Sequence, residues 1–259
     1  MLKLLRIEYS KLKYYNAFWI MNIAYIALLP LTMYGFSQLE IPFWPNSTDV
    51  FFGFKDVWNV GAFVASWYNI LLGIVVIIFT CNEFTNKTMR QNIIDGLSRF
   101  SVFKAKFILI LAYSIFAALY TFIISLLFGL IFSSSSISFS GVDIILLYFV
   151  QTFGYLCLAI MFAFLLRKAG FTIIMFAGAI FVEFIVRAML DDITAQFFPI
   201  RTMSKLVPIP FFEMIQQMAM EKEGREFFKI SIQAQLGLYV FYLTSFIGVT
   251  FWNFKRRNA

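Results

Sequence analysis

The sequence predicts an all-α protein, a polytopic membrane helix bundle of six transmembrane helices that forms a single domain over residues 1–259. Hydrophobic residues make up 61% of the chain. They gather in six stretches, each close to the roughly 20 apolar residues that a helix needs to cross a bilayer. Because backbone polar groups in lipid must be satisfied internally, these spans are expected to be helical. They lie at about residues 16–36, 61–81, 107–132, 142–166, 170–190 and 233–253.

The Lys and Arg residues indicate how the bundle is oriented. If the N-terminus is cytoplasmic, the inner segments hold most of the 21 Lys and Arg residues, and the first two outer segments hold only Lys55. The third outer segment, residues 191–232, is also basic, but long loops count less in the positive-inside rule. Both termini are therefore predicted to be cytoplasmic. The net charge of +7 comes mostly from these inner Lys and Arg residues, which also attract anionic membrane lipids. No nucleic-acid partner is therefore expected.

The first element, residues 1–15, precedes the spans. Leu2, Leu5, Tyr9 and Leu12 recur at spacings that place them on one face of a helix, and basic residues occupy the other faces. This pattern predicts an amphipathic helix that lies in the inner headgroup layer. A solvated charged tail is the alternative.

Small residues follow each other at intervals of four along the second and third spans. Such stripes allow helices to approach closely. Packing within the subunit is the simpler interpretation, and a subunit interface or a transport pathway is the alternative. The stripes are Gly61, Ala65, Asn69 and Gly73 in the second span, and Ala117, Thr121, Ser125 and Gly129 in the third.

The segment between these spans, residues 82–106, is predicted to be cytoplasmic and to contain a short helix. Thr88 can cap a helix that runs through Ile94 and ends at Gly96. Met89, Ile93 and Leu97 would share its apolar face. A short amphipathic helix at the membrane surface is suited to dock into a groove on another protein.

This segment resembles the coupling-helix region of type-2 ABC transporter permeases. An acidic residue leaves the second span, a Thr follows, and a Ser-Arg pair and a Lys come after the short helix. Lys87 stands where the family pattern has Gly, and Gly96 stands where it has Pro, which indicates a divergent subfamily. The architecture is similar over the whole chain, whereas the motif covers only residues 82–106. The matching residues are Glu83, Thr88, Ser98, Arg99 and Lys106.

The resemblance implies a mechanism and a set of partners. Two permease subunits, alike or related, would form the pathway, and two copies of an ABC ATP-binding subunit would bind their cytoplasmic face. The chain lacks the Gly-x-x-x-x-Gly-Lys-Ser/Thr phosphate loop, so ATP and Mg belong to that partner and no catalytic residue or cofactor is expected here. The residues implied in contact with the ATPase or in coupling to it are Glu83, Thr88, Met89, Ile93, Leu97, Arg99 and Lys106.

Glu183 and Arg187 are ionisable residues within the fifth span. At a spacing of four they share a helix face and are predicted to pair. Ionisable residues inside a membrane often serve function, although a structural pair near the outer headgroups is the alternative. CAAX-type membrane proteases use Glu-Glu-x-x-x-Arg with His residues, but Val182 precedes Glu183 and the chain contains no His, so this activity is not expected.

The cysteines and the long outer loop complete the functional hypothesis. Cys81 and Cys157 both fall at or within spans and indicate no disulfide framework. The outer loop 191–232 is expected either to cap the bundle or to take part in substrate passage. The hypothesis is a multi-pass permease of an ATP-driven exporter in a prokaryotic cytoplasmic membrane, with a hydrophobic, amphipathic or peptide- or lipid-like substrate. The alternative is a non-transporting immunity, sensory or scaffold subunit associated with an ABC-type ATPase.

Overall fold

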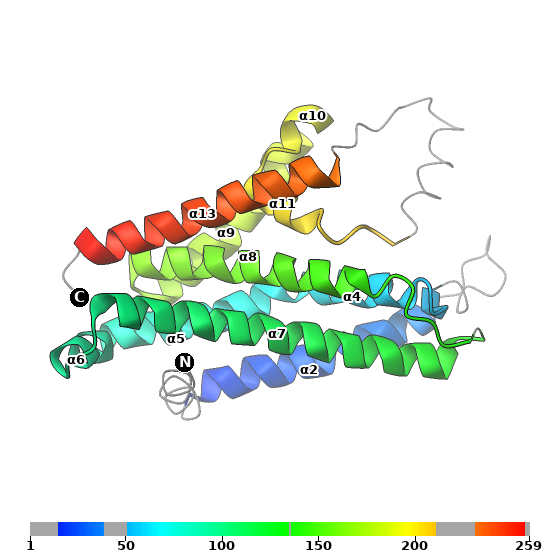
Figure 1. Cartoon of the computed structure of the whole chain (residues 1–259), viewed down its shortest axis with the longest axis horizontal. Helices are drawn as coiled ribbons and strands as arrows, with labels where there is room; N and C mark the ends of the chain where they lie inside the picture. The colour runs from blue at the N-terminus through cyan, green and yellow to red at the C-terminus, as the bar shows by residue number, and fades with distance from the viewer. Residues whose placement is uncertain (1–14, 39–50, 135, 211–230, 257–259) are drawn as a thin grey trace.

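The structure is a computed structural model that describes residues 15–38, 51–134, 136–210 and 231–256. The regular elements in these ranges are all helices, which confirms the all-α prediction for this part of the chain (Figure 1). The predicted interfacial helix, residues 1–15, lies almost entirely outside the described residues. The helices are α2 (Asn16–Ser37), α4 (Val57–Trp67), α5 (Asn69–Thr85), α6 (Thr88–Ile94), α7 (Arg99–Phe132), α8 (Asp143–Leu166), α9 (Ala169–Ala188), α10 (Asp192–Ala195), α11 (Pro199–Ser204) and α13 (Ile232–Arg256).

Five of these helices, α2, α7, α8, α9 and α13, are long and apolar enough to cross a membrane. A sixth span is possible if α4 and α5, which meet at an angle of 43°, are counted together. The chain is therefore a multi-pass membrane protein with five or six candidate spans. The second predicted span corresponds to this bent pair rather than to one straight helix. The pair begins before and ends after the predicted limits of 61–81.

The third predicted span also begins earlier than expected. α7 starts at Arg99 because the hydroxyl of Ser98 accepts a hydrogen bond from the backbone N–H of Ser101 at 3.1 Å. This contact satisfies one of the N–H groups that a helix start leaves free. The charged residues Lys104 and Lys106 therefore belong to α7 rather than to a loop.

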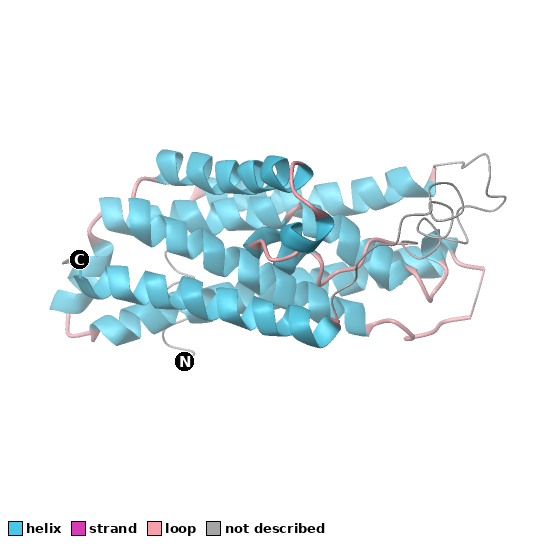
Figure 2. Cartoon of the chain, turned by 90° about the horizontal axis from the view of Figure 1, so that it is seen from above, coloured by secondary structure: helices cyan, strands magenta, loops and turns pink. Residues whose placement is uncertain are grey.

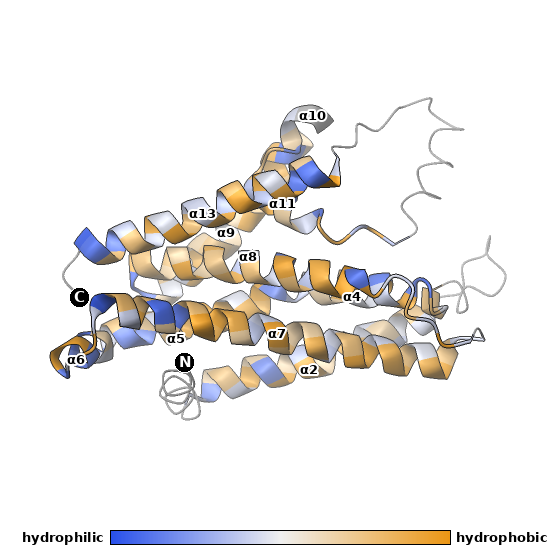
Figure 3. Cartoon of the chain, viewed as in Figure 1, coloured by the Kyte–Doolittle hydropathy of each residue, from blue (hydrophilic) through white to orange (hydrophobic). Residues whose placement is uncertain are grey.

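The long helices run lengthwise through the molecule (Figures 1 and 2). Among the five candidate spans that consist of a single helix, α8 is the most buried. It contacts α5, α7, α13, α4 and α9. By contrast, α2, α9 and α13 expose large apolar side chains such as Ile20, Ile174 and Phe241. Hydrophobic colouring covers the middle of the bundle, and hydrophilic colouring lies mainly toward the ends of the helices. It is found on part of α6 and on the adjacent parts of α7 and α13 at one end, and at the starts of α8 and α13 toward the other (Figure 3). This distribution suits a bundle surrounded by lipid.

Connections alternate between the two ends of the bundle. The start of α2, the end of α13 and α6 lie toward one end, and the connection from α7 to α8 lies at the other (Figure 1). α10 and α11 lie between α9 and α13 and occupy the described part of the predicted loop 191–232.

The two small-residue stripes lie inside the bundle. A Cβ atom added to Gly61 would approach the hydroxyl of Ser125 on α7 to 1.9 Å, and one added to Gly73 would meet the ring of Phe176 on α9 at 2.7 Å. This burial favours packing within the subunit over a subunit interface or pathway. The buried members are Gly61, Ala65, Asn69, Gly73, Ala117, Thr121, Ser125 and Gly129.

Candidate functional site

α6 is a short helix with a defined start and end. Lys87, which precedes it, has the left-handed conformation, with φ of 55°. Gly96 also has a positive φ, of 96°. The N–H of Gly96 bonds to the carbonyl of Ile93, and the N–H of Leu97 bonds to that of Asn92, which is the pattern of a Schellman C-terminus. The predicted end of the helix, at Ile94 with Gly96 as the stop, agrees with the structure. The predicted cap is wrong, because Lys87 occupies the N-cap position and Thr88, the first residue of α6, makes no capping hydrogen bond.

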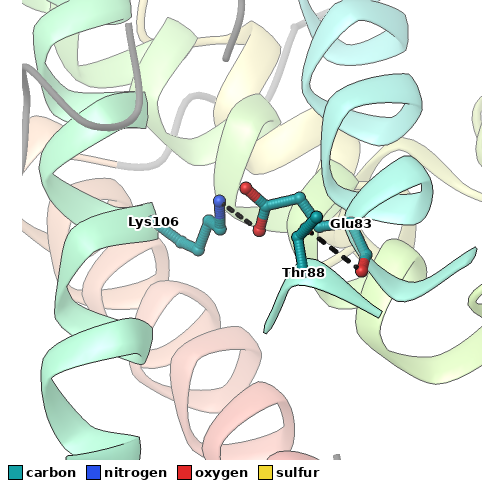
Figure 4. A network of polar contacts seen from close by, with 3 residues as sticks. All are labelled: Glu83, Thr88 and Lys106. Carbon is teal, nitrogen blue, oxygen red and sulfur yellow. Dashed lines mark hydrogen bonds and ion pairs between the residues drawn. The ribbon is translucent and has the colours of Figure 1, made fainter. Parts of the chain in front are cut away.

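A buried ion pair lies directly behind α6. The ammonium of Lys106 on α7 is 2.6 Å from a carboxylate oxygen of Glu83 on α5, and their side chains are only 1% and 3% exposed (Figure 4). The same ammonium lies 4.3 Å from the centre of the Phe79 ring. The hydroxyl of Thr88 donates to the backbone carbonyl of Glu83 at 3.5 Å. Three predicted coupling residues therefore form one internal network that joins α5, α6 and α7.

The orientation of α6 differs from the prediction. Met89 is buried, and Ile93 and Leu97 are partly buried against the core of the same subunit. The apolar face expected to enter an ATPase groove instead packs against the bundle, because the neighbouring α5 and α7 are close enough to cover it. The face left exposed consists of Arg90, Gln91, Ile94 and Asp95, and Ile94 is 74% exposed. Arg99, at the start of α7, is also exposed.

The predicted ion pair in the fifth span does not form. Glu183 and Arg187 are both described, and no ion pair joins them. Instead, the Glu183 carboxylate accepts hydrogen bonds from the backbone N–H groups of Ile200 at 3.0 Å and Arg201 at 2.7 Å. These N–H groups belong to the first turn of α11, where they have no partner within the helix and favour a negative charge. Glu183 therefore anchors α11 to α9.

Further contacts hold α11 against the bundle. The amide of Gln235 on α13 donates to the carbonyl of Thr202 at 3.4 Å. The hydroxyl of Tyr242 donates to the carbonyl of Phe197. The first part of the loop 191–232 is thus a structured segment bound to α9 and α13, whereas residues 211–230 lie outside the described part.

A buried polar cluster crosses the middle of the bundle and was not predicted. The hydroxyl of Tyr25 on α2 lies 3.1 Å from that of Tyr148 on α8 and 3.4 Å from that of Thr121 on α7. The hydroxyl of Thr152 donates to the Asn69 side-chain oxygen at 3.0 Å. The sequence could have indicated this cluster through the polar side chains that stand in otherwise apolar spans. Such side chains usually hydrogen-bond to each other across helices.

The family model of the ABC-2 family transporter proteins matches residues 4–186. This match covers more than half of the chain. The chain belongs to the ABC-2 family. No curated protein sequence matches the chain.

Membership makes this chain an ABC transporter permease. ABC-2 permeases are transmembrane subunits that normally carry no catalytic site and work with an ABC ATPase. The match includes α6 and the buried pair behind it, and it ends within α9, so α10, α11 and α13 lie outside it. In this ABC-2 permease, the left-handed backbone at Lys87 gives a physical reason for the Gly that the resembling pattern has there, because Gly adopts positive φ without steric penalty.

Proposed function

We propose that this ABC-2 permease is the transmembrane subunit of an ATP-driven exporter in a prokaryotic cytoplasmic membrane. Both termini and α6 are cytoplasmic in this proposal. Two copies of a separate ATP-binding subunit hold ATP and Mg, and a second permease subunit, identical or related, completes the pathway. This chain itself binds no cofactor and contributes the membrane path and the surface on which the ATPase acts.

The observation that carries the proposal is the attachment of α6. A partner can contact the exposed residues Arg90, Gln91, Ile94 and Asp95, while the opposite face is fixed to the bundle by Met89. The Glu83–Lys106 pair joins the last turn of α5 to the first turns of α7. A push on α6 is therefore delivered to two spans together, as an ATP-driven permease requires.

The substrate class rests on composition alone. Aromatic residues make up 20% of the chain, and it contains 11 Met residues. Such side chains suit a hydrophobic, amphipathic, peptidic or lipid-like cargo better than a small ion, because they offer apolar and polarisable contacts.

Ile94→Asp tests the role of α6. Truncation of an apolar anchor at an interface typically costs about 2 kcal/mol or more, and a carboxylate buried there without a partner adds to the loss. The variant is expected to release the ATP-binding subunit, or to separate ATP hydrolysis from transport, while the permease folds normally. Co-purification from membranes followed by an ATPase assay in proteoliposomes measures both effects.

The matched control is Ile137→Asp, which places the same change on a side chain that is also exposed, in the connection between α7 and α8. Assembly and ATPase activity are expected to stay normal in this variant. Full assembly and coupling in Ile94→Asp would contradict the proposal. ATP-independent ligand binding, with no coupled turnover in the wild type, would favour the non-transporting immunity, sensory or scaffold subunit instead.

A further inference from the structure

The second span is bent where its sequence has neither Pro nor Gly, two residues after Ser66, whose hydroxyl donates to the backbone carbonyl of Phe63 at 2.6 Å. α4 and α5 meet at 43° and are separated only by Tyr68. Sharp bends in helices usually occur at Pro, at Gly or Ser, at a π-bulge or where a side chain interrupts the hydrogen bonds. Here the N–H of Tyr68 bonds to the carbonyl of Ala65, and the N–H of Leu71 bonds to that of Tyr68, both at 3.0 Å. These three-residue bonds are of the 3₁₀ type, which often marks a hinge within a helix.

A polar residue stands at the break and is incompletely satisfied. Asn69, the first residue of α5, is 1% exposed. Its side-chain oxygen accepts the bond from Thr152, but its side-chain nitrogen has no hydrogen-bond partner among the described residues. A buried amide nitrogen without an acceptor is unfavourable, because the group loses the hydrogen bonds that it makes with water in the unfolded chain. The break therefore carries a polar group that the surrounding helices satisfy only in part.

The hydroxyl cluster of Tyr25, Tyr148 and Thr121 lies against the same break. The ring of Tyr25 meets the ring of Tyr68 edge-to-face, with centroids 6.5 Å apart. Tyr148 and Thr152 are four residues apart on α8 and therefore share a helix face. Two of these side chains contact the break directly, Tyr25 from α2 and Thr152 from α8. Tyr148 on α8 and Thr121 on α7 are connected to it through the hydroxyl of Tyr25.

The helix on the other side of the break leads directly to α6. α5 is continuous from Asn69 to Thr85, and only Asn86 and Lys87 separate it from α6. At 1.5 Å per residue, α5 is about 25 Å long, so a rotation of about 10° at the break would move its far end by about 4 Å. The Glu83–Lys106 pair links this end of α5 to the first turns of α7, whose last turns pack against α4 and its preceding segment.

From these contacts we propose that Tyr68–Asn69 is a hinge about which α5 and α6 move as one lever, and that a latch made of Tyr25, Tyr148, Thr121, Thr152 and Asn69 holds the lever at its present angle. The role of the lever in transport rests on the proposed function, because it is the ATP-binding subunit that would move α6. The hinge and the latch themselves belong to this chain and can be tested without that subunit.

Thr152→Val tests the latch, because Val has the shape of Thr without the hydroxyl that bonds Asn69. Spin labels at Gln91 on α6 and Lys255 on α13 report the position of the lever. A second pair, Lys55 and Ser136, reports the part of the molecule on the α4 side of the break. Cys81 and Cys157 are replaced by Ala in all proteins, and distances are measured by double electron–electron resonance in lipid nanodiscs, with and without the ATP-binding subunit and ATP.

In the permease alone, Thr152→Val is expected to shift or broaden the Gln91–Lys255 distance by about 4 Å, the displacement of a 10° rotation, with the Lys55–Ser136 distance unchanged. Tyr148→Phe, which removes a second latch hydroxyl, is expected to act in the same direction. Thr250→Val is the matched control, because the hydroxyl of Thr250 is buried and bonds only within α13, to the carbonyl of Phe246.

An unchanged Gln91–Lys255 distance in both latch variants, or a joint change of both label pairs, would overturn the hinge. A shift in the latch variants without any response of the wild type to ATP would support the hinge and would contradict the proposed coupling function instead.

Discussion

Glu83 and Lys106 each bury a charge that would be unfavourable alone, and each is satisfied by the other. Lys106→Met is therefore expected to lower the free energy of unfolding by about 3–5 kcal/mol, the usual effect of leaving a buried charge without its partner. The double variant Glu83→Gln/Lys106→Met, which removes both charges, is expected to recover much of this loss. Thermal unfolding of the purified permease, followed by tryptophan fluorescence, measures both. A double variant less stable than Lys106→Met would contradict the pairing.

A second prediction about a single side chain concerns Glu183. Each oxygen of the Glu183 carboxylate accepts one hydrogen bond, from the N–H of Ile200 or from that of Arg201. Glu183→Gln replaces one of these oxygens by an NH₂ group, which cannot accept, so one of the two bonds is lost. Amide hydrogen exchange at Ile200 and Arg201 is expected to accelerate, while exchange in the middle of α8 stays slow. Arg187→Gln is the control and is expected to leave these amides protected, because Arg187 forms no ion pair with Glu183. Equal exchange rates in Glu183→Gln and the wild type would show that the carboxylate does not anchor α11.

The sequence identified the ionisable residues but not all of their partners. Glu83 and Lys106 were both selected through the family resemblance, yet their mutual contact depends on how α5 and α7 pack. Glu183 was assigned to Arg187 because a spacing of four places them on one helix face. In the structure the Glu183 carboxylate instead accepts from the backbone N–H groups at the start of α11. The position of these groups depends on the path of a loop, which no periodic sequence pattern reveals.

At the scale of elements, the bounds of α6 were predictable and its orientation was not. Gly96 sets the end of the helix through local backbone geometry, which the sequence encodes directly. The apolar spacing of Met89, Ile93 and Leu97 defines a face but does not say whether the same subunit or a partner covers it. The bend at Tyr68 was missed because no Pro or Gly marks it, and single polar residues such as Ser66 and Asn69 do not by themselves end an apolar helix.

Gly73 tests whether the small residues of α5 serve close packing. A Cβ added there would lie 2.7 Å from the ring of Phe176, which is fully buried, and 3.5 Å from the Cβ of Ala159. Gly73→Ala is expected to destabilise the permease by about 1–3 kcal/mol, as overpacked cores usually do, and Phe176→Leu in the same chain is expected to restore part of this loss. Thermal unfolding is the measurement.

Gly178→Ala is the matched control for Gly73→Ala. No neighbouring atom of the described residues lies within 4 Å of a Cβ built at Gly178 on α9. The substitution is expected to leave stability unchanged or to raise it, since Ala favours helix more than Gly does. Equal effects of the two substitutions would show that the contact with Phe176 does not limit the size of the side chain at Gly73.

At the scale of the whole molecule, apolar length and charge distribution predicted the helical bundle and the approximate limits of most spans. The central position of α8 could not be predicted in this way, because the candidate spans are all strongly apolar. In a soluble helix a polar face marks the outer side, but lipid removes that contrast. The burial of Tyr148, Gln151 and Thr152 shows that the informative residues were the polar ones within the span.

The remaining prediction concerns the orientation of the bundle. The end of α13 lies toward the same end of the molecule as α6, and the connection from α7 to α8 lies at the opposite end (Figure 1). Among the described residues, the segments near the first end carry most of the Lys and Arg residues, which favour the cytoplasmic side. A reporter fused after Ala259 is therefore expected to be active in the cytoplasm, and one inserted at Ser136 is expected to be active outside. Phosphatase and fluorescent-protein fusions distinguish the two locations. A cytoplasmic signal from the Ser136 fusion would contradict a bundle in which α7 and the bent pair α4–α5 each cross the membrane once.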